Sequence, residues 1–160
     1  EQKRVIILLA IVAILLTVIV MLSIFYIRAT HSMSQAKREA VKIAEEYAQM
    51  DEVEDFYWFN RKETYFTVMG TDESGKEIIV IVPEKGGTVT TLNQEDGISE
   101  GQAKQMVAQS YDESNIQKAN LGIFDGEVVW EVVAKSEEGP LHYYLLSFEE
   151  GKEVNVIQNI

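Results

Sequence analysis

Cysteine is absent from this chain of 160 residues, and proline and histidine are scarce, with two of each. Without cysteine the chain cannot form disulfides, use a catalytic thiol, bind metal through thiolates or carry a lipidated cysteine. Basic residues are also few, since 14 Lys and Arg stand against 26 Asp and Glu and the net charge is −12. A charge of this sign repels polyanions, so we expect no nucleic-acid partner.

Charged residues are missing altogether from residues 5–27, which read VIILLAIVAILLTVIVMLSIFYI. As a helix rising about 1.5 Å per residue, this segment reaches roughly 34 Å and crosses a hydrocarbon layer of about 30 Å. A cleavable signal peptide is the alternative, because Lys3 and Arg4 form a basic start. The apolar run exceeds a usual signal core, and no small-x-small site follows it before Arg28. The sequence therefore predicts an uncleaved transmembrane signal anchor.

The orientation of the anchor follows from its short basic end. A count of Lys and Arg within about 15 residues of the span favours the C-terminal side, but a short basic tail is a poor candidate for translocation. We expect residues 1–4 to be a cytoplasmic tip and the C-terminal domain to be extracytoplasmic, in a single-pass cell-membrane protein. Residues 28–160 hold 12 Lys and Arg against 25 Asp and Glu, a net charge of −13.

The sequence after the span repeats itself at an offset of 64 residues, without a gap. The matches fall at helix stripes, strand centres and turn glycines, which favours duplication over chance. The fold class predicted is α+β, with the transmembrane helix followed by two tandem units at 28–93 and 94–160. Each unit is one helix packed on an antiparallel sheet of three to four strands. The identical pairs are Ala44/Ala108, Tyr47/Tyr111, Glu63/Glu127, Val68/Val132, Glu73/Glu137, Gly75/Gly139 and Gly87/Gly151.

Periodic apolar residues place the two helices. The first stripe contains Ala36, Ala40, Ile43, Ala44 and Tyr47, and the second contains Ala103, Met106, Val107 and Tyr111. An S-x-x-Q cap begins each helix, at 32–35 and 99–102, although the first helix could run on unbroken from the membrane. Residues 78–82 are continuously apolar and predict burial on both faces of a strand. Because the linker 93–97 is short, we expect one semi-rigid body of two lobes.

Residues for catalysis are few. His31 follows the membrane span and His142 begins a strand, so we expect both to have ordinary structural roles. The many carboxylates cluster in turns and on polar helix faces, where a solvated surface is the default. We predict no active site, no catalytic residue, no cofactor, no metal ion and no small-molecule substrate.

Four consecutive aromatic residues, 56–59, indicate a surface role. In a strand, two of them must point to each face of the sheet. At the offset of 64, Tyr57 and Phe59 match apolar residues, so we assign them to the helix-covered core. Phe56 and Trp58 match an amide and a glycine, so we assign them to the opposite face. They are the candidate partner-binding residues, and packing between the two lobes is the alternative.

Several segments together resemble the TseB-like (YpmB-like) membrane proteins of Gram-positive bacteria. These are the basic tip and signal anchor, VIVPEKGG, EDGISEGQAKQMV, VVWEVV and YYLLSFEEGKEV. The resemblance covers almost the whole chain, and GISE at 97–100 and WEV at 130–132 are its most specific parts. It implies tandem PepSY-like modules with a cystatin-like fold. It also implies regulation of cell-wall elongation through a class B penicillin-binding protein, and it provides no catalytic residue to transfer.

We therefore expect a non-enzymatic, membrane-anchored regulator of peptidoglycan synthesis that binds a class B penicillin-binding protein or another wall-assembly protein. The alternative is a PepSY-type inhibitor or modulator of an extracytoplasmic protease. In that case the turn 137–140 would be the tip that enters the protease cleft.

Overall fold

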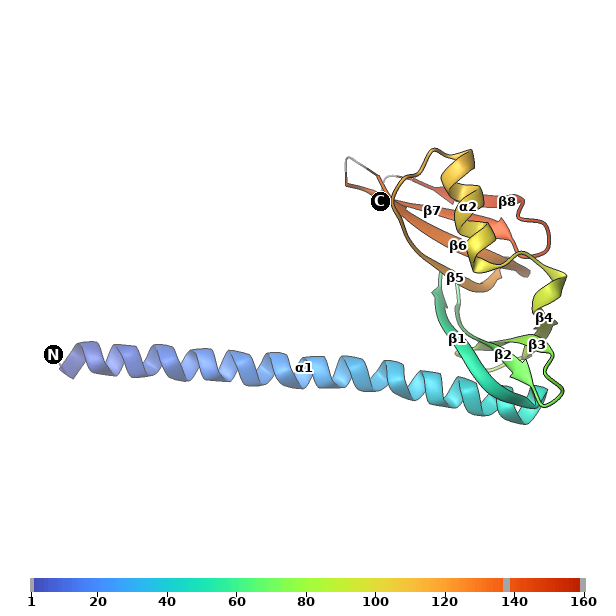
Figure 1. Ribbon diagram of the computed structural model, residues 1–160. Helices are drawn as coiled ribbons and strands as arrows, with labels where there is room; N and C mark the ends of the chain where they lie inside the picture. The colour runs from blue at the N-terminus through green and yellow to red at the C-terminus, as the bar shows by residue number, and fades with distance from the viewer. Residues whose placement is uncertain (1, 137–138, 159–160) are drawn as a thin grey trace. The chain divides into compact units, whose positions relative to one another are not determined.

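The computed structural model describes residues 2–136 and 139–158 (Figure 1). They form two compact units, Glu1–Arg38 and Glu39–Ile160. The elements, in chain order, are α1 (Gln2–Ala48), β1 (Met50–Asn60), β2 (Thr64–Asp72), β3 (Glu77–Pro83), β4 (Thr90–Asn93), the 3₁₀ turn η1 (Gln94–Asp96), α2 (Glu100–Ser110), β5 (Ile116–Phe124), β6 (Glu127–Lys135), β7 (Leu141–Ser147) and β8 (Glu153–Ile157).

The first unit is the N-terminal part of α1. Residues Leu9–Ile27 have a mean hydropathy of 2.9, and none is buried by the protein. Two hydroxyls in this stretch bond back to the helix, Thr17 Oγ1 to the Ala13 carbonyl at 2.9 Å and Ser23 Oγ to the Ile19 carbonyl at 2.8 Å. Polar groups are thereby satisfied within an otherwise apolar helix, as a lipid environment requires. By length and composition the segment could cross a membrane.

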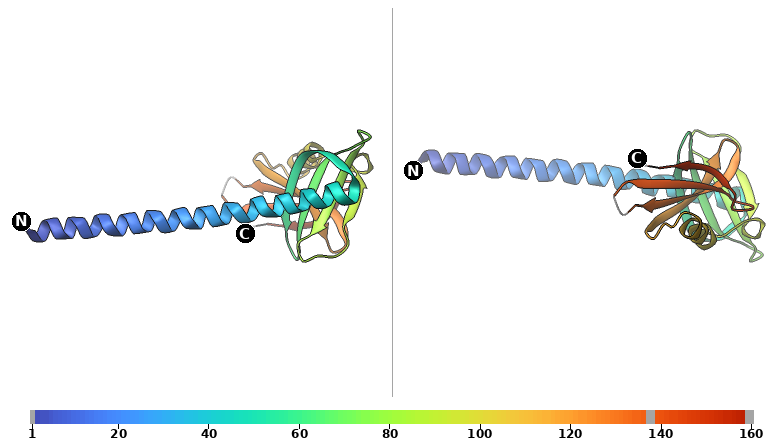
Figure 2. Two further views of the ribbon diagram at one scale, coloured as in Figure 1. Left: turned by 90° about the horizontal axis from the view of Figure 1, so that it is seen from below. Right: turned by 90° about the horizontal axis from the view of Figure 1, so that it is seen from above.

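The second unit contains two antiparallel four-stranded sheets, in strand orders β1-β2-β3-β4 and β5-β6-β7-β8. This confirms an α+β fold with an apolar N-terminal helix and two sheets, consistent with tandem units. The last turns of α1, from Glu39, lie along one face of the first sheet, and the second sheet and α2 lie beyond its other face (Figures 1 and 2).

The helices follow the sequence pattern only in part. Ser99 and Gln102 form a capping box at the start of α2, as the sequence predicts. Residues 32–35 lie inside α1, which runs on unbroken from the apolar segment. Ala40 and Ala44 are buried, but Tyr47 is 72% exposed, so its prediction as a core residue was wrong. Tyr47 lies in the last turn of α1, next to the left-handed Gln49 that ends the helix.

The duplication carries one gap, contrary to the gapless offset expected from the sequence. Three residues, Arg61–Glu63, connect β1 to β2, whereas only Asp125 and Gly126 connect β5 to β6. The buried helix residues Ala40 and Ala44 correspond to Ala103 and Val107, an offset of 63. In the hairpins, Trp58 pairs with Phe66 and Leu121 pairs with Trp130. Trp58 therefore corresponds to Leu121 at an offset of 63, and Phe66 corresponds to Trp130 at an offset of 64.

This one-residue shift reverses the predicted faces of β1, because side chains alternate along a strand. Trp58 corresponds to Leu121, which α2 covers, so Phe56 and Trp58 lie on the face that carries the end of α1. Tyr57 and Phe59 are buried as expected, but on the face toward the second sheet. The two pairs do lie on opposite faces, but the prediction of which pair faces the helix was wrong.

A continuous core joins the two sheets. Tyr57, Met69, Ile79 and Ile81 of the first sheet share one buried cluster with α2 and the α2-facing residues of the second sheet, which are Ala119, Leu121, Trp130, Val132, Ala134, Tyr144 and Leu146. All five residues of 78–82 are buried, as predicted. One sheet with its helix, about 60 residues, would bury only about 60% of its unfolded surface. The core shared by the two sheets supplies the additional burial.

The two sheets approach each other closely at Gly122. Phe59 occupies the space where a side chain at position 122 would lie, and a Cβ built there would be 2.2 Å from Phe59 Cγ. Phe59 is itself fully buried against Val129 and Leu145. An aromatic ring on β1 therefore requires a glycine on β5.

We predict that Gly122→Ala destabilises the domain by about 1–3 kcal/mol, the usual cost of an overpacked core. The measurement is thermal unfolding of the full chain in detergent, followed by tryptophan fluorescence. Gly101→Ala is the matched control, because a Cβ at that exposed helical position would meet only Ser99 Oγ, at 3.9 Å. Equal melting temperatures for the two variants would contradict the packing assigned to Phe59.

Candidate functional site

The predicted partner-binding residues form an aromatic group at the margin of the first sheet. Phe56 and Trp58 are half-buried, and both rings contact Phe66. The Phe56 and Phe66 rings are stacked with centroids 6.1 Å apart, and Trp58 meets Phe66 edge-on at 5.2 Å. Neither Phe56 nor Trp58 belongs to the core between the sheets. Each ring is anchored on one side, and each retains exposed area that another molecule could cover.

Tyr57, by contrast, belongs to the seam between the sheets. Its ring meets Trp130 edge-on at 5.3 Å, and its hydroxyl donates to Glu100 Oε2 at 2.7 Å. Burial, followed by the contact with Glu100, raises the pKa of Tyr57. Burial also acts to raise the pKa of Glu100, but hydrogen bonds from Lys104 and Tyr57 outweigh it and the net shift is downward. The carboxylate therefore ties β1 to the start of α2.

A second polar link crosses the seam from the β1–β2 hairpin. Arg61 donates to Glu131 Oε2, and their side chains are 19% and 6% exposed. Asn120 donates to the other oxygen of Glu131 at 3.2 Å, and the Arg61 guanidinium lies 4.1 Å from the Tyr143 ring centroid. A buried carboxylate left without its partner is strongly destabilising. The β1–β2 connection, which is one residue longer than the β5–β6 connection, therefore also carries Arg61, whose contact with Glu131 joins the two sheets.

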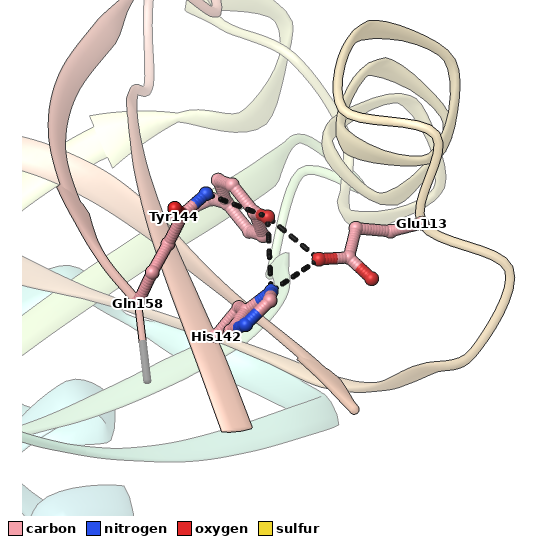
Figure 3. A network of polar contacts seen from close by, with 4 residues as sticks. All are labelled: Glu113, His142, Tyr144 and Gln158. Atoms are coloured by element: carbon pink, nitrogen blue, oxygen red, sulfur yellow. Dashed lines mark hydrogen bonds and ion pairs between the residues drawn. The ribbon is translucent and has the colours of Figure 1, made fainter. Parts of the chain in front are cut away.

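A group of titratable side chains lies between the loop after α2 and the second sheet (Figure 3). Glu113 Oε1 lies 2.6 Å from His142 Nδ1 and accepts a hydrogen bond from the Tyr144 hydroxyl, also at 2.6 Å. Gln158 donates to the Tyr144 hydroxyl at 3.5 Å. The Tyr111 ring packs on Tyr144 with centroids 4.3 Å apart. The cluster connects the loop after α2, strand β7 and the residue that follows β8.

The environment of this cluster stabilises the Glu113 carboxylate. The hydrogen bond from Tyr144 lowers the pKa of Glu113, burial opposes the shift, and His142 adds to the lowering. Burial and the contact with Glu113 raise the pKa of Tyr144 to about 12. Within residues 2–136 and 139–158, His142 Nε2 is buried without a hydrogen-bond partner. The cluster therefore fastens the C-terminal strand and the 111–115 loop, and Nε2 of its histidine is not presented to solvent.

Other predicted positions are placed as follows. His142 lies near the start of β7, which agrees with the strand-end role expected of it. The side chain of His31 lies outside the described residues, and so do Glu137 and Glu138 of the turn predicted as an inhibitor tip. In the described part of the chain, no three His, Asp or Glu side chains are grouped closely enough to hold a metal ion.

Two depressions flank the turn η1. One, of about 580 Å³, is lined mainly by acidic and apolar residues, which are Leu92, Asp96, Gly126, Glu127, Val128, Ser147, Phe148, Glu149 and Glu150. The other, of about 310 Å³, lies beside the start of α2 and includes Tyr57, Ile98, Glu100 and Phe148. Neither is lined by His142 or Glu113. Ser147 Oγ, in the larger depression, accepts a hydrogen bond from the Lys152 amide at 3.0 Å.

Two short patterns match catalytic serine motifs by spacing alone. Residues 97–101, GISEG, have the G-x-S-x-G spacing of a nucleophile elbow, and residues 34–37, SQAK, have the S-x-x-K spacing. Ser99 follows a 3₁₀ turn rather than a strand, and its hydroxyl caps α2 by accepting from the Gln102 amide at 3.2 Å. Ser34 lies within the long helix α1. Neither serine has the strand–turn–helix setting of an elbow.

The comparisons with known proteins agree with the geometry. Residues 39–83, which cover the end of α1 and strands β1–β3, match the family model described as "Cell wall elongation regulator TseB-like domain". The probable cell wall elongation regulator TseB of Bacillus subtilis (strain 168) is 29% identical over 128 residues, covering 79% of this chain and 73% of the relative. The solved structure of the YpmB protein from Bacillus subtilis is 26% identical, with a TM-score of 0.67, and the match covers 76% of this chain and 95% of that one.

We predict that Glu113→Gln lowers stability at neutral pH by about 1 kcal/mol or more, because it weakens two buried hydrogen bonds. Since the pKa of Glu113 is lowered by folding, its contribution is present above the unfolded-state pKa and is lost as pH falls through the folded-state pKa. The deficit of the variant should therefore shrink on acidification from pH 7 toward pH 3. Unfolding midpoints across this range provide the measurement.

Glu84→Gln is the control for this pH series, because Glu84 is an exposed loop residue. Its stability should follow that of the unmodified chain at every pH. A Glu113→Gln deficit that stayed constant with pH would show that the carboxylate charge is not what stabilises the cluster.

Proposed function

Because this chain belongs to the TseB-like (YpmB-like) family, we propose that it is a non-enzymatic, membrane-anchored regulator of cell wall elongation that binds a class B penicillin-binding protein. The observation that carries the proposal is the family match over residues 39–83, together with the apolar N-terminal helix. The curated relative is named a probable cell wall elongation regulator. A regulator of this kind acts by contact, so its function lies in a surface rather than in reacting side chains.

We further propose that α1 is an uncleaved signal anchor over residues 5–27. Residues 1–4 are then cytoplasmic and the domain is extracytoplasmic, in a Gram-positive cell. The tandem units are 28–93 and 94–160, each a PepSY-like, cystatin-like module of one helix on a sheet. Supporting this division, α2 packs on the second sheet and the buried Ala40 and Ala44 of α1 occupy the corresponding positions of the first.

Anchoring has an energetic consequence for the proposed interaction. Two proteins confined to one membrane meet at a raised effective concentration, so a small interface of modest affinity is sufficient. The half-buried Phe56 and Trp58 are suited to such an interface, since both rings are already held by Phe66 and lose little rotamer freedom on binding. Both residues lie in the segment that matches the family model.

We predict that Trp58→Ala reduces capture of the penicillin-binding protein several-fold while lowering the melting temperature only slightly. Capture is measured by crosslinking the full chain in native membranes, pulling it down and detecting bound partner with a fluorescent penicillin. Val68→Ala is the matched control. Val68 is fully buried on the same sheet face, so its truncation should lower stability and leave the surface unchanged.

The two variants separate binding from packing. If Trp58→Ala lowered stability as much as Val68→Ala and capture fell equally in both, Trp58 would be a packing residue only. If the unmodified chain captured no penicillin-binding protein or other wall-assembly protein from intact cells, the proposed partner would be wrong.

A further inference from the structure

The N-terminal half of β1 is strongly acidic. Residues 51–55 read DEVED, and all five are exposed. No Lys or Arg occurs between Lys42 and Arg61, so the neighbouring sequence supplies no cation to this stretch. The ion pairs formed within residues 2–136 and 139–158 include none of its four carboxylates, which belong to Asp51, Glu52, Glu54 and Asp55.

Protection of a sheet edge does not by itself account for this charge. β1 is an edge strand of the first sheet (Figure 1), and charged residues on an edge prevent other strands from pairing with it. The register of β1 already shifts twice, between Met50 and Glu52 and between Val53 and Asp55. Such irregularities also prevent pairing. Like charges close together cost stability, so four unpaired carboxylates indicate a role beyond the fold.

The second repeat shows that a strand of this shape does not need the charges. The register shift between Val53 and Asp55 recurs between Ile116 and Lys118, so β1 aligns with β5 through the irregular stretch at an offset of 63. Residues 51–55 carry four negative charges, whereas residues 114–118 carry one positive charge. The residues that stand at the four acidic positions are Ser114, Asn115, Gln117 and Lys118.

The acidic stretch runs directly into the aromatic residues proposed to bind the partner. Phe56 and Trp58 follow it on the same strand and are half-buried. The second repeat lacks both features, because Ala119 and Leu121 stand at the aromatic positions and no carboxylate precedes them on β5. Protein interfaces combine aromatic anchors at the centre with a polar rim that stays accessible to solvent. The first repeat alone has this combination on its first strand.

We propose that residues 51–55 form an acidic rim of the surface that contains Phe56 and Trp58, and that the partner surface covering it is basic. Lys or Arg side chains of the penicillin-binding protein then surround an apolar contact with the two rings. The inference rests on the proposed function and adds the chemistry of the partner's contact surface. Charges at the rim of an interface act mainly on the rate of association and on its salt dependence.

The second repeat supplies the residues for a test that preserves the strand. The rim variant takes the residues found 63 positions later and removes three negative charges by Asp51→Ser, Glu52→Asn and Glu54→Gln. Its matched control removes three negative charges at exposed positions elsewhere, by Glu84→Gln, Glu127→Gln and Glu149→Gln. Penicillin-binding protein captured by the crosslinked full chain is measured in native membranes at about 0.1 M and about 1 M salt, where the Debye length is about 10 Å and about 3 Å.

The unmodified chain is expected to lose most of its capture at the higher salt concentration. At the lower concentration the rim variant should capture about three- to ten-fold less partner, because charge complementarity raises association rates by about ten-fold or more. The capture that remains should change little with salt. The melting temperature of the rim variant should equal or exceed that of the unmodified chain, since repulsion between like charges is relieved. The control should keep both its capture and its salt dependence.

Other outcomes would overturn the acidic rim. Equal capture by the rim variant and its control would do so and leave the proposed function in place. Capture by the unmodified chain that is as strong at about 1 M as at about 0.1 M salt would do so without depending on the folding of any variant. Loss of capture together with a lower melting temperature would assign residues 51–55 a structural role. Failure of the unmodified chain to capture any penicillin-binding protein would instead contradict the proposed function.

Discussion

The packing of β1 against the second sheet is the interaction on which the rest of the domain depends. Tyr57 extends from β1 into a core that also contains α2 and Trp130, and Phe59 packs against Val129 and Leu145 and fills the space left by Gly122. A repeat of about 60 residues would be only marginally stable alone. The buried Thr67 hydroxyl, which donates to the Leu121 carbonyl at 2.7 Å, satisfies a polar group within the same contact. The two repeats therefore form one body rather than two linked domains.

The shared core also determines which aromatic residues remain available. One extra residue in the β1–β2 hairpin turns Tyr57 and Phe59 toward the second sheet and leaves Phe56 and Trp58 on the face of α1. In the second repeat, Ala119 and Leu121 stand at the positions of Phe56 and Trp58. They are covered by Ala103 and Val107 of α2. In the first repeat the strand residues are larger, and the helix residues that face them are the alanines Ala40 and Ala44. The rings of Phe56 and Trp58 are left half-exposed at the margin of the sheet. The proposed regulatory surface is thus a consequence of asymmetry between the repeats.

The polar clusters of the domain also hold its two sheets and the segments around them together. Arg61 with Glu131, Tyr57 with Glu100, and Glu113 with His142 and Tyr144 each join segments that are distant in sequence. Their carboxylates are held by hydrogen bonds within the protein, and these contacts are costly to disturb. A domain stabilised in this way can present a constant surface to a partner while the N-terminal helix restricts where that partner is met.

The sequence by itself determined the apolar helix, the α2 capping box and the burial of residues 78–82, because these depend on composition and local periodicity. It also predicted a tandem organisation, with which the two four-stranded sheets are consistent. It also supported the family assignment through short motifs. Only the tertiary structure decided which face each aromatic residue occupies, because a one-residue difference between hairpins reverses a strand and leaves no trace in a gapless alignment. The pairing of Phe59 with Gly122 and the grouping of Glu113 with His142 were likewise beyond sequence reasoning. Both depend on contacts between segments about 30 to 60 residues apart, which local patterns do not encode.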